Sequence, residues 1–263
     1  MKIFFYKYGI FNLDEINVLR RLPWTLLLIF FPIAFLVACS KNVNNPGYEF
    51  QISVGEQFVR SGDYERGYRI LEKVSEKNPN AASVQLALAE SFFEQRAYLK
   101  AQSHYDQVIQ LGETVEGKIG KARIALAQND AKSAIEMFNV ILVDEPMSLI
   151  ALNGMGVAYD LLGQHEIAQN YYKQVLTHNT DDVAAINNIA LSKTMNGNRA
   201  EGERLLSTLL LSTQDKATVR QNTAFVKAIN GKTDKAQVLF GLDLVGWEIN
   251  HNINVARRLA QFL

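Results

Sequence analysis

Residues 149–182, LIALNGMGVAYDLLGQHEIAQNYYKQVLTHNTDD, form two apolar runs separated by a glycine. Large apolar side chains recur in both runs at spacings of three and four residues, the period of a buried helix face; they are Leu152, Met155, Tyr159, Tyr172 and Val175. Gly163 stands between the runs, where glycine readily takes the left-handed conformation that ends many helices. Gly156 and Ala168 are small enough to let two helices touch. The stretch therefore predicts two packed helices joined by a glycine turn.

The same order of small, large and helix-breaking residues recurs along the chain at steps of 34 residues. Forward steps place Gly197 and Gly231 at the turn, and the first copy places Gly62 there. One residue is missing from the register between residues 112 and 115. Six copies fit between residue 48 and about residue 250. Two helices in 34 residues resemble a tetratricopeptide repeat (TPR), which implies an all-α, right-handed superhelical solenoid of about six repeats over residues 48–250.

Four cationic residues interrupt the apolar pattern of the repeats: Lys118, Lys193, Arg220 and Lys227. Each stands where other copies carry a hydrophobic or small residue. We therefore expect the third, fifth and sixth copies to pack less tightly, or these side chains to bury their aliphatic stems and keep their charges near the surface.

The composition is that of an ordinary globular protein. The chain has 27 basic and 27 acidic residues, 48% of its residues are hydrophobic, and it has no basic run. Nucleic-acid binding of the non-specific kind requires clustered Lys and Arg to contact phosphates. The sequence therefore predicts no nucleic-acid partner.

The N-terminal segment has the features of a secretory signal. Arg20 and Arg21 precede an apolar run over residues 22–37, which is short for a membrane-spanning helix of about 20 residues. The segment ends in Leu36, Val37, Ala38 and Cys39, so small residues precede the single cysteine of the chain. A positive segment, a short apolar run and small residues before a cut predict that residues 1–38 are a signal peptide.

The last four of these residues resemble the lipobox of bacterial lipoproteins, in which the cysteine thiol receives a diacylglycerol before cleavage. The resemblance implies a lipid-anchored mature chain that begins at Cys39. Ser40 follows it instead of aspartate, which by the usual sorting rule of diderm bacteria implies the periplasmic face of the outer membrane. The alternatives are a signal anchor with a chance cysteine, or an uncleaved anchor in the inner membrane. Residues 39–47 are polar with a Pro-Gly pair and predict a flexible tether.

The first helix of each repeat should line a concave wall, the usual ligand surface of such solenoids. The fifth place of successive copies carries Asn153, Asn187 and Gln221. An amide offers donors and acceptors that match a peptide backbone, so this ladder would hold an extended protein segment. The alternative is that the amides only solvate an exposed wall. Neighbouring wall candidates mix apolar and charged groups, which suits a protein partner; they are Glu90, Phe93, Arg123, Leu126, Val157, Asp160 and Leu191.

The sequence contains no recognisable catalytic or metal-binding pattern. Its four histidines, His104, His165, His178 and His251, show no HExxH spacing, and no G-x-S-x-G or Gly-rich phosphate loop is present. The cysteine is assigned to the N-terminus, which excludes a Cys-His pair. We therefore expect no catalytic residue, no metal, no cofactor and no small-molecule substrate, and predict that the protein is not an enzyme.

The C-terminal stretch carries the most specific resemblance to a known family. Residues 219–224 read VRQNTA, and Gly231, Ala236, Asp243-Leu244 and Asn252 follow. This order resembles the end of TadD-type TPR lipoproteins of the tight adherence (Tad, Flp) pilus system, although Thr223, Phe225 and Lys227 stand where more aliphatic residues are expected. In that family the last helix pair leads through an Asp-Leu segment into a short closing helix. The resemblance implies a capping helix at residues 251–263.

The resemblance also implies a function. A TadD-type lipoprotein would be a pilotin-like scaffold that binds the secretin of the Tad machine, or a segment of it, while its acyl chains hold it at the outer membrane. Alternative roles for a TPR lipoprotein are a type IV pilus pilotin, or an adaptor for barrel assembly or for peptidoglycan enzymes.

Overall fold

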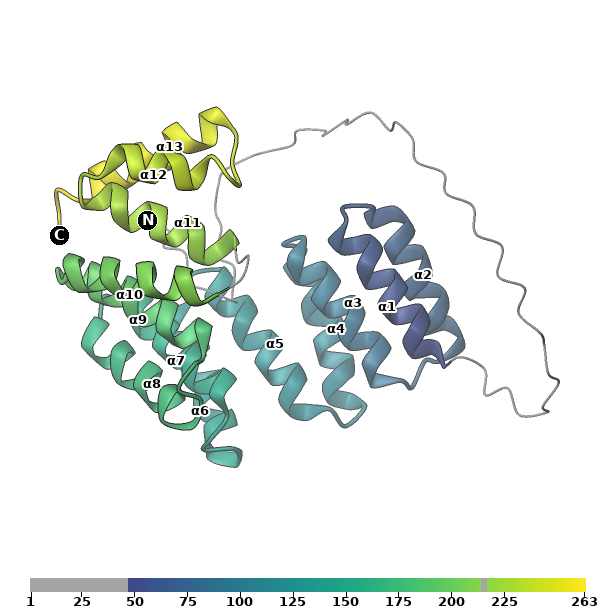
Figure 1. Ribbon diagram of the computed structural model, residues 1–263. Coiled ribbons are helices and arrows are strands. Elements are labelled where there is room, and N and C mark those ends of the chain that lie inside the picture. Colours follow the sequence, from purple (N-terminus) through teal and green to yellow (C-terminus); the bar gives the residue numbers. More distant parts are fainter. Residues whose placement is uncertain (1–46, 214–216) are drawn as a thin grey trace, which may run out of the picture. The chain divides into compact units, whose positions relative to one another are not determined.

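The computed structural model describes residues 47–213 and 217–263 (Figure 1). The signal peptide at residues 1–38, with Leu36, Val37 and Ala38, lies outside the described residues, as do the lipidation site Cys39 and the tether up to residue 46. The chain divides into two compact units. The described part of the N-terminal unit is residues 47–79, and that of the C-terminal unit is residues 80–213 and 217–263.

The N-terminal unit contains two packed helices, α1 (Tyr48–Arg60) and α2 (Tyr64–Lys77). Its apolar contacts are made by Ile52, Val59, Leu71 and Val74, all buried. The Asp63 side chain accepts a hydrogen bond from the N–H of Arg66 and so caps the start of α2. This pair is the first predicted repeat.

The C-terminal unit contains five further helix pairs and a closing helix. Each helix packs on the next, and the first helices of successive pairs also contact one another, from α3 to α11. No strand occurs among the described residues. The six helix pairs confirm the predicted all-α TPR architecture. The helices are α3 (Ala82–Glu94), α4 (Tyr98–Gln110), α5 (Thr114–Ala127), α6 (Ala131–Asp144), α7 (Leu149–Leu161), α8 (His165–His178), α9 (Val183–Met195), α10 (Arg199–Ser212), α11 (Ala217–Ile229), α12 (Thr233–Phe240) and α13 (Gly246–Leu259).

The predicted turn position has a positive φ in all six pairs. Gly163 has φ +74°, and the equivalent glycines Gly62, Gly197 and Gly231 have φ between +76° and +86°. The second and third pairs carry Arg96 and Asn129 there, at φ 60° and 63°. An extra positive-φ residue, Gly112, lies where the sequence register loses one residue. Backbone conformation, and not the glycine itself, is therefore what repeats.

Replacing Gly163 with alanine should lower the free energy of unfolding by about 1 kcal/mol, because a residue with a Cβ is strained in the left-handed region. An added Cβ meets nothing within 4 Å, so the loss is purely conformational. Urea unfolding followed by circular dichroism measures it. Gly246→Ala is the matched control, since its added Cβ also meets nothing and its φ is not positive; equal losses in both variants would contradict the prediction.

The small residues of the starting stretch lie where its two helices meet. Gly156 of α7 is covered by the ring of Tyr172 from α8, so an added Cβ would overlap that ring. Ala168 of α8 is completely buried in the same hydrophobic core as Tyr172. The prediction that Gly156 marks the helix contact is confirmed, and the burial of Ala168 agrees with its predicted place there.

The closing helix starts earlier than predicted. α13 begins at Gly246 and ends at Leu259, whereas the sequence placed the cap at residues 251–263. The Glu248 carboxylate accepts a hydrogen bond from the N–H of Val245 at 2.9 Å, which favours a helix start at this point. Ile253, Ala256 and Leu259 pack against Ala224, Phe225 and Ala228 of α11, so α13 covers the apolar end of the last pair.

Two of the four interrupting cations pair with buried carboxylates. Arg220 binds both oxygens of Asp243, and Lys227 binds Glu203; both cationic side chains are only 16% exposed. Lys118 lies 3.5 Å from Asp144. Arg220 and Lys227 therefore bury most of the side chain, as expected for their stems, and pair the charge with a carboxylate. Their charges are stabilised by carboxylates from the following or preceding segment.

Candidate functional site

The amides of the predicted concave wall are mostly buried. Asn153 is 5% exposed and Asn187 is 0% exposed, while Gln221 is partly exposed. The prediction that Asn153 and Asn187 present free amides to a partner is therefore wrong. On a helix packed between two others, the fifth place of the repeat faces the neighbouring first helix and not solvent.

A chain of side-chain amides runs through this buried region instead. Asn222 of α11 donates to Asn187 of α9 at 3.0 Å, Asn187 donates to its neighbour Asn188 at 3.2 Å, and Asn188 donates to Asn153 of α7 at 3.1 Å. These bonds satisfy amide groups that would be costly to bury alone. The amides thus join three successive first helices to one another.

Four other wall candidates, on α5, α7 and α9, are also buried. Val157, Asp160 and Leu191 are at most 3% exposed, so the prediction that they line an open wall is wrong. Leu126 is likewise completely buried. These side chains belong to the apolar core between α5 and α9 or, for Asp160, to a polar cluster inside it.

Asp160 is the centre of that polar cluster. Its carboxylate accepts hydrogen bonds from His165 Nδ1 at 2.7 Å, Ser192 Oγ at 2.7 Å and Tyr172 Oη at 2.8 Å. Burial raises the pKa of the Asp160 carboxyl, and the three hydrogen bonds act in the opposite direction. Burial also raises the pKa of the Tyr172 hydroxyl well above its usual value. The cluster links α7, α8 and α9.

The residue types of this cluster include serine, histidine and aspartate, but their geometry is not that of a nucleophilic triad. Ser192 donates directly to Asp160, not to the His165 ring, and its side chain is fully buried. A nucleophile needs a base that takes its proton and a route to substrate. The hydrogen bonds to Asp160 instead hold α7, α8 and α9 in position.

Glu90, Phe93 and Arg123 of the predicted wall do come together. The Glu90 carboxylate accepts hydrogen bonds from Arg123 Nη1 at 2.6 Å and from Tyr105 Oη at 2.7 Å. The Arg123 guanidinium lies 4.5 Å from the centre of the Phe93 ring. Phe93 is buried, so the prediction that it lines an open wall is wrong. Glu90 and Arg123 are partly exposed, so their role in binding a partner, like that of Gln221, stays a prediction.

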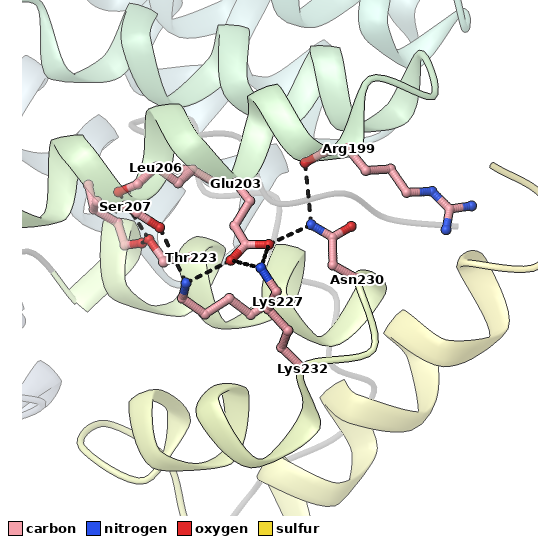
Figure 2. A network of polar contacts seen from close by, with 9 residues as sticks. Arg199, Glu203, Leu206, Ser207, Thr223, Lys227, Asn230 and Lys232 are labelled. Carbon is pink, nitrogen blue, oxygen red and sulfur yellow. Dashed lines mark hydrogen bonds and ion pairs between the residues drawn. The ribbon is translucent and has the colours of Figure 1, made fainter.

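A second polar cluster surrounds Glu203 of α10 (Figure 2). Lys227 donates to Oε1 at 2.9 Å, Lys232 contacts both oxygens at 2.8 Å, and Asn230 donates to Oε2 at 2.7 Å. Asn230 also donates to the carbonyl of Arg199 at 3.3 Å. Burial raises the pKa of the Glu203 carboxyl, but the hydrogen bonds from Lys232, Asn230 and Lys227 outweigh it and lower the pKa to about 2.

An open cleft of ≈ 670 Å³ adjoins this cluster, between α10 and the turn that joins α11 to α12. Its lining is Arg199, Ala200, Glu203, Arg204, Ser207, Ile229, Asn230, Gly231 and Lys232. The sequence marked Lys227 as misplaced in the apolar pattern but did not reveal the cleft. Glu203 and Lys227 are 24 residues apart, a spacing that no local pattern detects.

Neither a metal site nor a membrane span is found in the described part of the chain. Its Cys, His, Asp and Glu side chains form no group of three or more that could hold an ion. None of its helices combines the length and the hydropathy needed to cross a bilayer.

Comparison with known sequences finds a tetratricopeptide repeat in one part of the chain. A tetratricopeptide repeat family model matches residues 55–116. A protein of Sinorhizobium fredii, described as uncharacterized protein y4yS, is 30% identical over 92 residues, which is 35% of this chain. The match spans half the length of that relative.

Solved structures of TPR proteins share the fold. PilW, described as a widely conserved type IV pilus biogenesis factor, aligns with a TM-score of 0.60 and 16% identity over 80% of this chain and 98% of its own. A TPR protein of Thermus thermophilus aligns at 0.59 and 19% identity, over 70% of this chain and 100% of its own. PilF of Pseudomonas aeruginosa aligns at 0.55 and 14% identity, over 78% and 95%. At these identities the likeness establishes the TPR fold alone.

Proposed function

We propose that this protein is an outer-membrane-anchored TPR lipoprotein and a pilotin-like scaffold for the secretin of a Tad/Flp pilus system. The observation that carries the proposal is the array of six helix pairs closed by α13, which aligns with nearly the whole chain of PilW, a type IV pilus biogenesis factor. PilF aligns over a similar extent. The lipobox-like residues before Cys39 support the proposed anchor, and the TadD-like order from Val219 to Asn252 supports the proposed pilus type.

The scaffold would act by attachment at two points. Acyl chains on Cys39 restrict the protein to the plane of the membrane, and the repeats bind a segment of the secretin. Confining both partners to one surface raises their effective concentration, so a modest affinity suffices to place a subunit at its assembly site. Binding and positioning need no chemical step.

Crosslinking in membranes tests this proposal. The full chain serves as bait in cells that carry the Tad system, and mass spectrometry identifies the captured proteins. We expect the secretin to dominate. Capture of a barrel-assembly component or a peptidoglycan enzyme in its place would overturn the secretin assignment and favour an adaptor for that complex.

Replacing Cys39 with alanine should abolish acylation and recovery in the outer-membrane fraction, because no other cysteine exists to receive the lipid. The repeats should keep their circular dichroism spectrum, since the substitution lies outside the helix pairs. Intact mass and membrane fractionation are the measurements. Ser40→Ala is the control that should remain acylated; an acylated Cys39→Ala protein in membranes would refute the anchor.

A further inference from the structure

The cleft beside Glu203 carries an excess of positive charge, although the chain as a whole has as many acidic as basic residues. Its lining includes the cations Arg199, Arg204 and Lys232, and Glu203 is the one acidic residue among the described lining residues. That carboxylate forms ion pairs with Lys232 and also with Lys227, which is not among the lining residues. One negative charge therefore faces two ammonium groups at the base of the cleft.

Hydrogen-bond donors at the mouth of the cleft remain open to a ligand. Arg204 is 62% exposed and commits Nε and Nη2 to Glu201, which leaves the donors on Nη1. Lys232 is 49% exposed, and its contacts to the two Glu203 oxygens leave one of three ammonium protons. Both groups suit a carboxylate, which accepts charge-assisted hydrogen bonds from such donors.

The size and opening of the cleft suit a chain segment. Its ≈ 670 Å³ lies in the range of about 300–1,000 Å³ typical of ligand sites. Gly231 lines it without a side chain, and an added Cβ there meets nothing within 4 Å. An extended segment can therefore approach the turn between α11 and α12 closely.

We propose that this cleft binds an acidic segment of a protein partner, with the partner's carboxylates on Arg204 and Lys232. The inference rests on the proposed scaffold function and names the chemistry of the segment that the scaffold holds. Glu203 keeps Lys232 and Asn230 in place before the partner arrives, so little side-chain conformational freedom is lost on binding.

A charge placed at Ala200 tests the proposal without disturbing the Glu203 network. Ala200 is exposed and lines the cleft. A fluorescent hexaglutamate peptide is titrated into the full chain and followed by anisotropy. Ala200→Glu should weaken binding about fivefold and Ala200→Lys should strengthen it, since a unit charge at close range contributes about 1 kcal/mol in water. Added salt should weaken binding to the wild type.

Thr208→Glu is the matched control, because Thr208 is exposed on the same helix and lies outside the cleft lining. It should bind as the wild type does. The proposal would be overturned if the full chain binds no peptide, or if Ala200→Glu and Thr208→Glu change peptide binding equally. It would also be overturned if phosphatidylglycerol vesicles bind in a way that depends on Ala200 while the peptide does not. If the full chain binds no peptide but still captures the secretin in membranes, the proposal for the cleft is refuted and the proposed scaffold function stands.

Discussion

Asp160→Ala is expected to lower the free energy of unfolding of the C-terminal unit by about 3–5 kcal/mol, the cost of breaking a buried, hydrogen-bonded charge cluster. The substitution leaves the buried hydroxyls of Tyr172 and Ser192 without their acceptor and opens a void between α7 and α9. Urea unfolding followed by circular dichroism measures the change.

Two further variants separate the role of this carboxyl from a general effect of substitution. Asp160→Asn should keep most of the stability, because burial already raises the pKa of the carboxyl and the amide oxygen still accepts from His165. Asp181→Ala removes an exposed carboxylate and should leave the unfolding midpoint in place. A midpoint for Asp160→Ala that matches that of Asp181→Ala would show that the cluster contributes nothing to stability.

Glu203→Gln is expected to remove an acid-sensitive part of the stability. The folded pKa of Glu203 is about 2, below its ordinary value of 4.5. Its contribution is therefore complete above about pH 4.5 and is lost as the pH falls through about 2. We expect Glu203 to contribute about 2 kcal/mol to the free energy of unfolding at neutral pH. This value already includes a reduction for solvent screening, because the partner Lys232 is half exposed.

The measurement compares wild type and variant across pH 2–7 by urea unfolding. The difference in stability between them should be largest at neutral pH and shrink between pH 4.5 and 2. Glu136→Gln, an exposed glutamate on α6, makes the same change of charge and should show no such window. A constant difference between wild type and Glu203→Gln over the whole range would refute the assignment of the low pKa.

The repeat spacing of 34 residues was predictable because each TPR unit is built from local contacts. The apolar period, the small residues Gly156 and Ala168 and the turn at Gly163 all act within one helix pair. Arg96 and Asn129 occupy the turn position of two repeats without being glycine, and only the structure reveals their positive φ. A strong local pattern therefore predicted the helix pairs, although it placed the start of the closing helix too late.

The destinations of polar side chains were not predictable in the same way. The sequence assigned Asn187 to an open wall, yet in the fold it is buried and hydrogen-bonds to Asn188 and to Asn222 of α11. Lys227 looked like a defect in an apolar pattern, and only the fold brings it to Glu203. Burial converts such residues from surface groups into partners whose hydrogen bonds must be satisfied.

By itself, the sequence determined an all-α chain of six TPR helix pairs with a closing helix, because helical periodicity, close helix contacts and turn residues are all local. The tertiary structure alone decided which polar groups are free. Packing of α7, α9 and α11 buries the amide chain, and packing of α10 against α11 creates the Glu203 cluster and the cationic cleft. These contacts join residues 20 to 35 positions apart, so they depend on how successive repeats stack and not on any pattern within one.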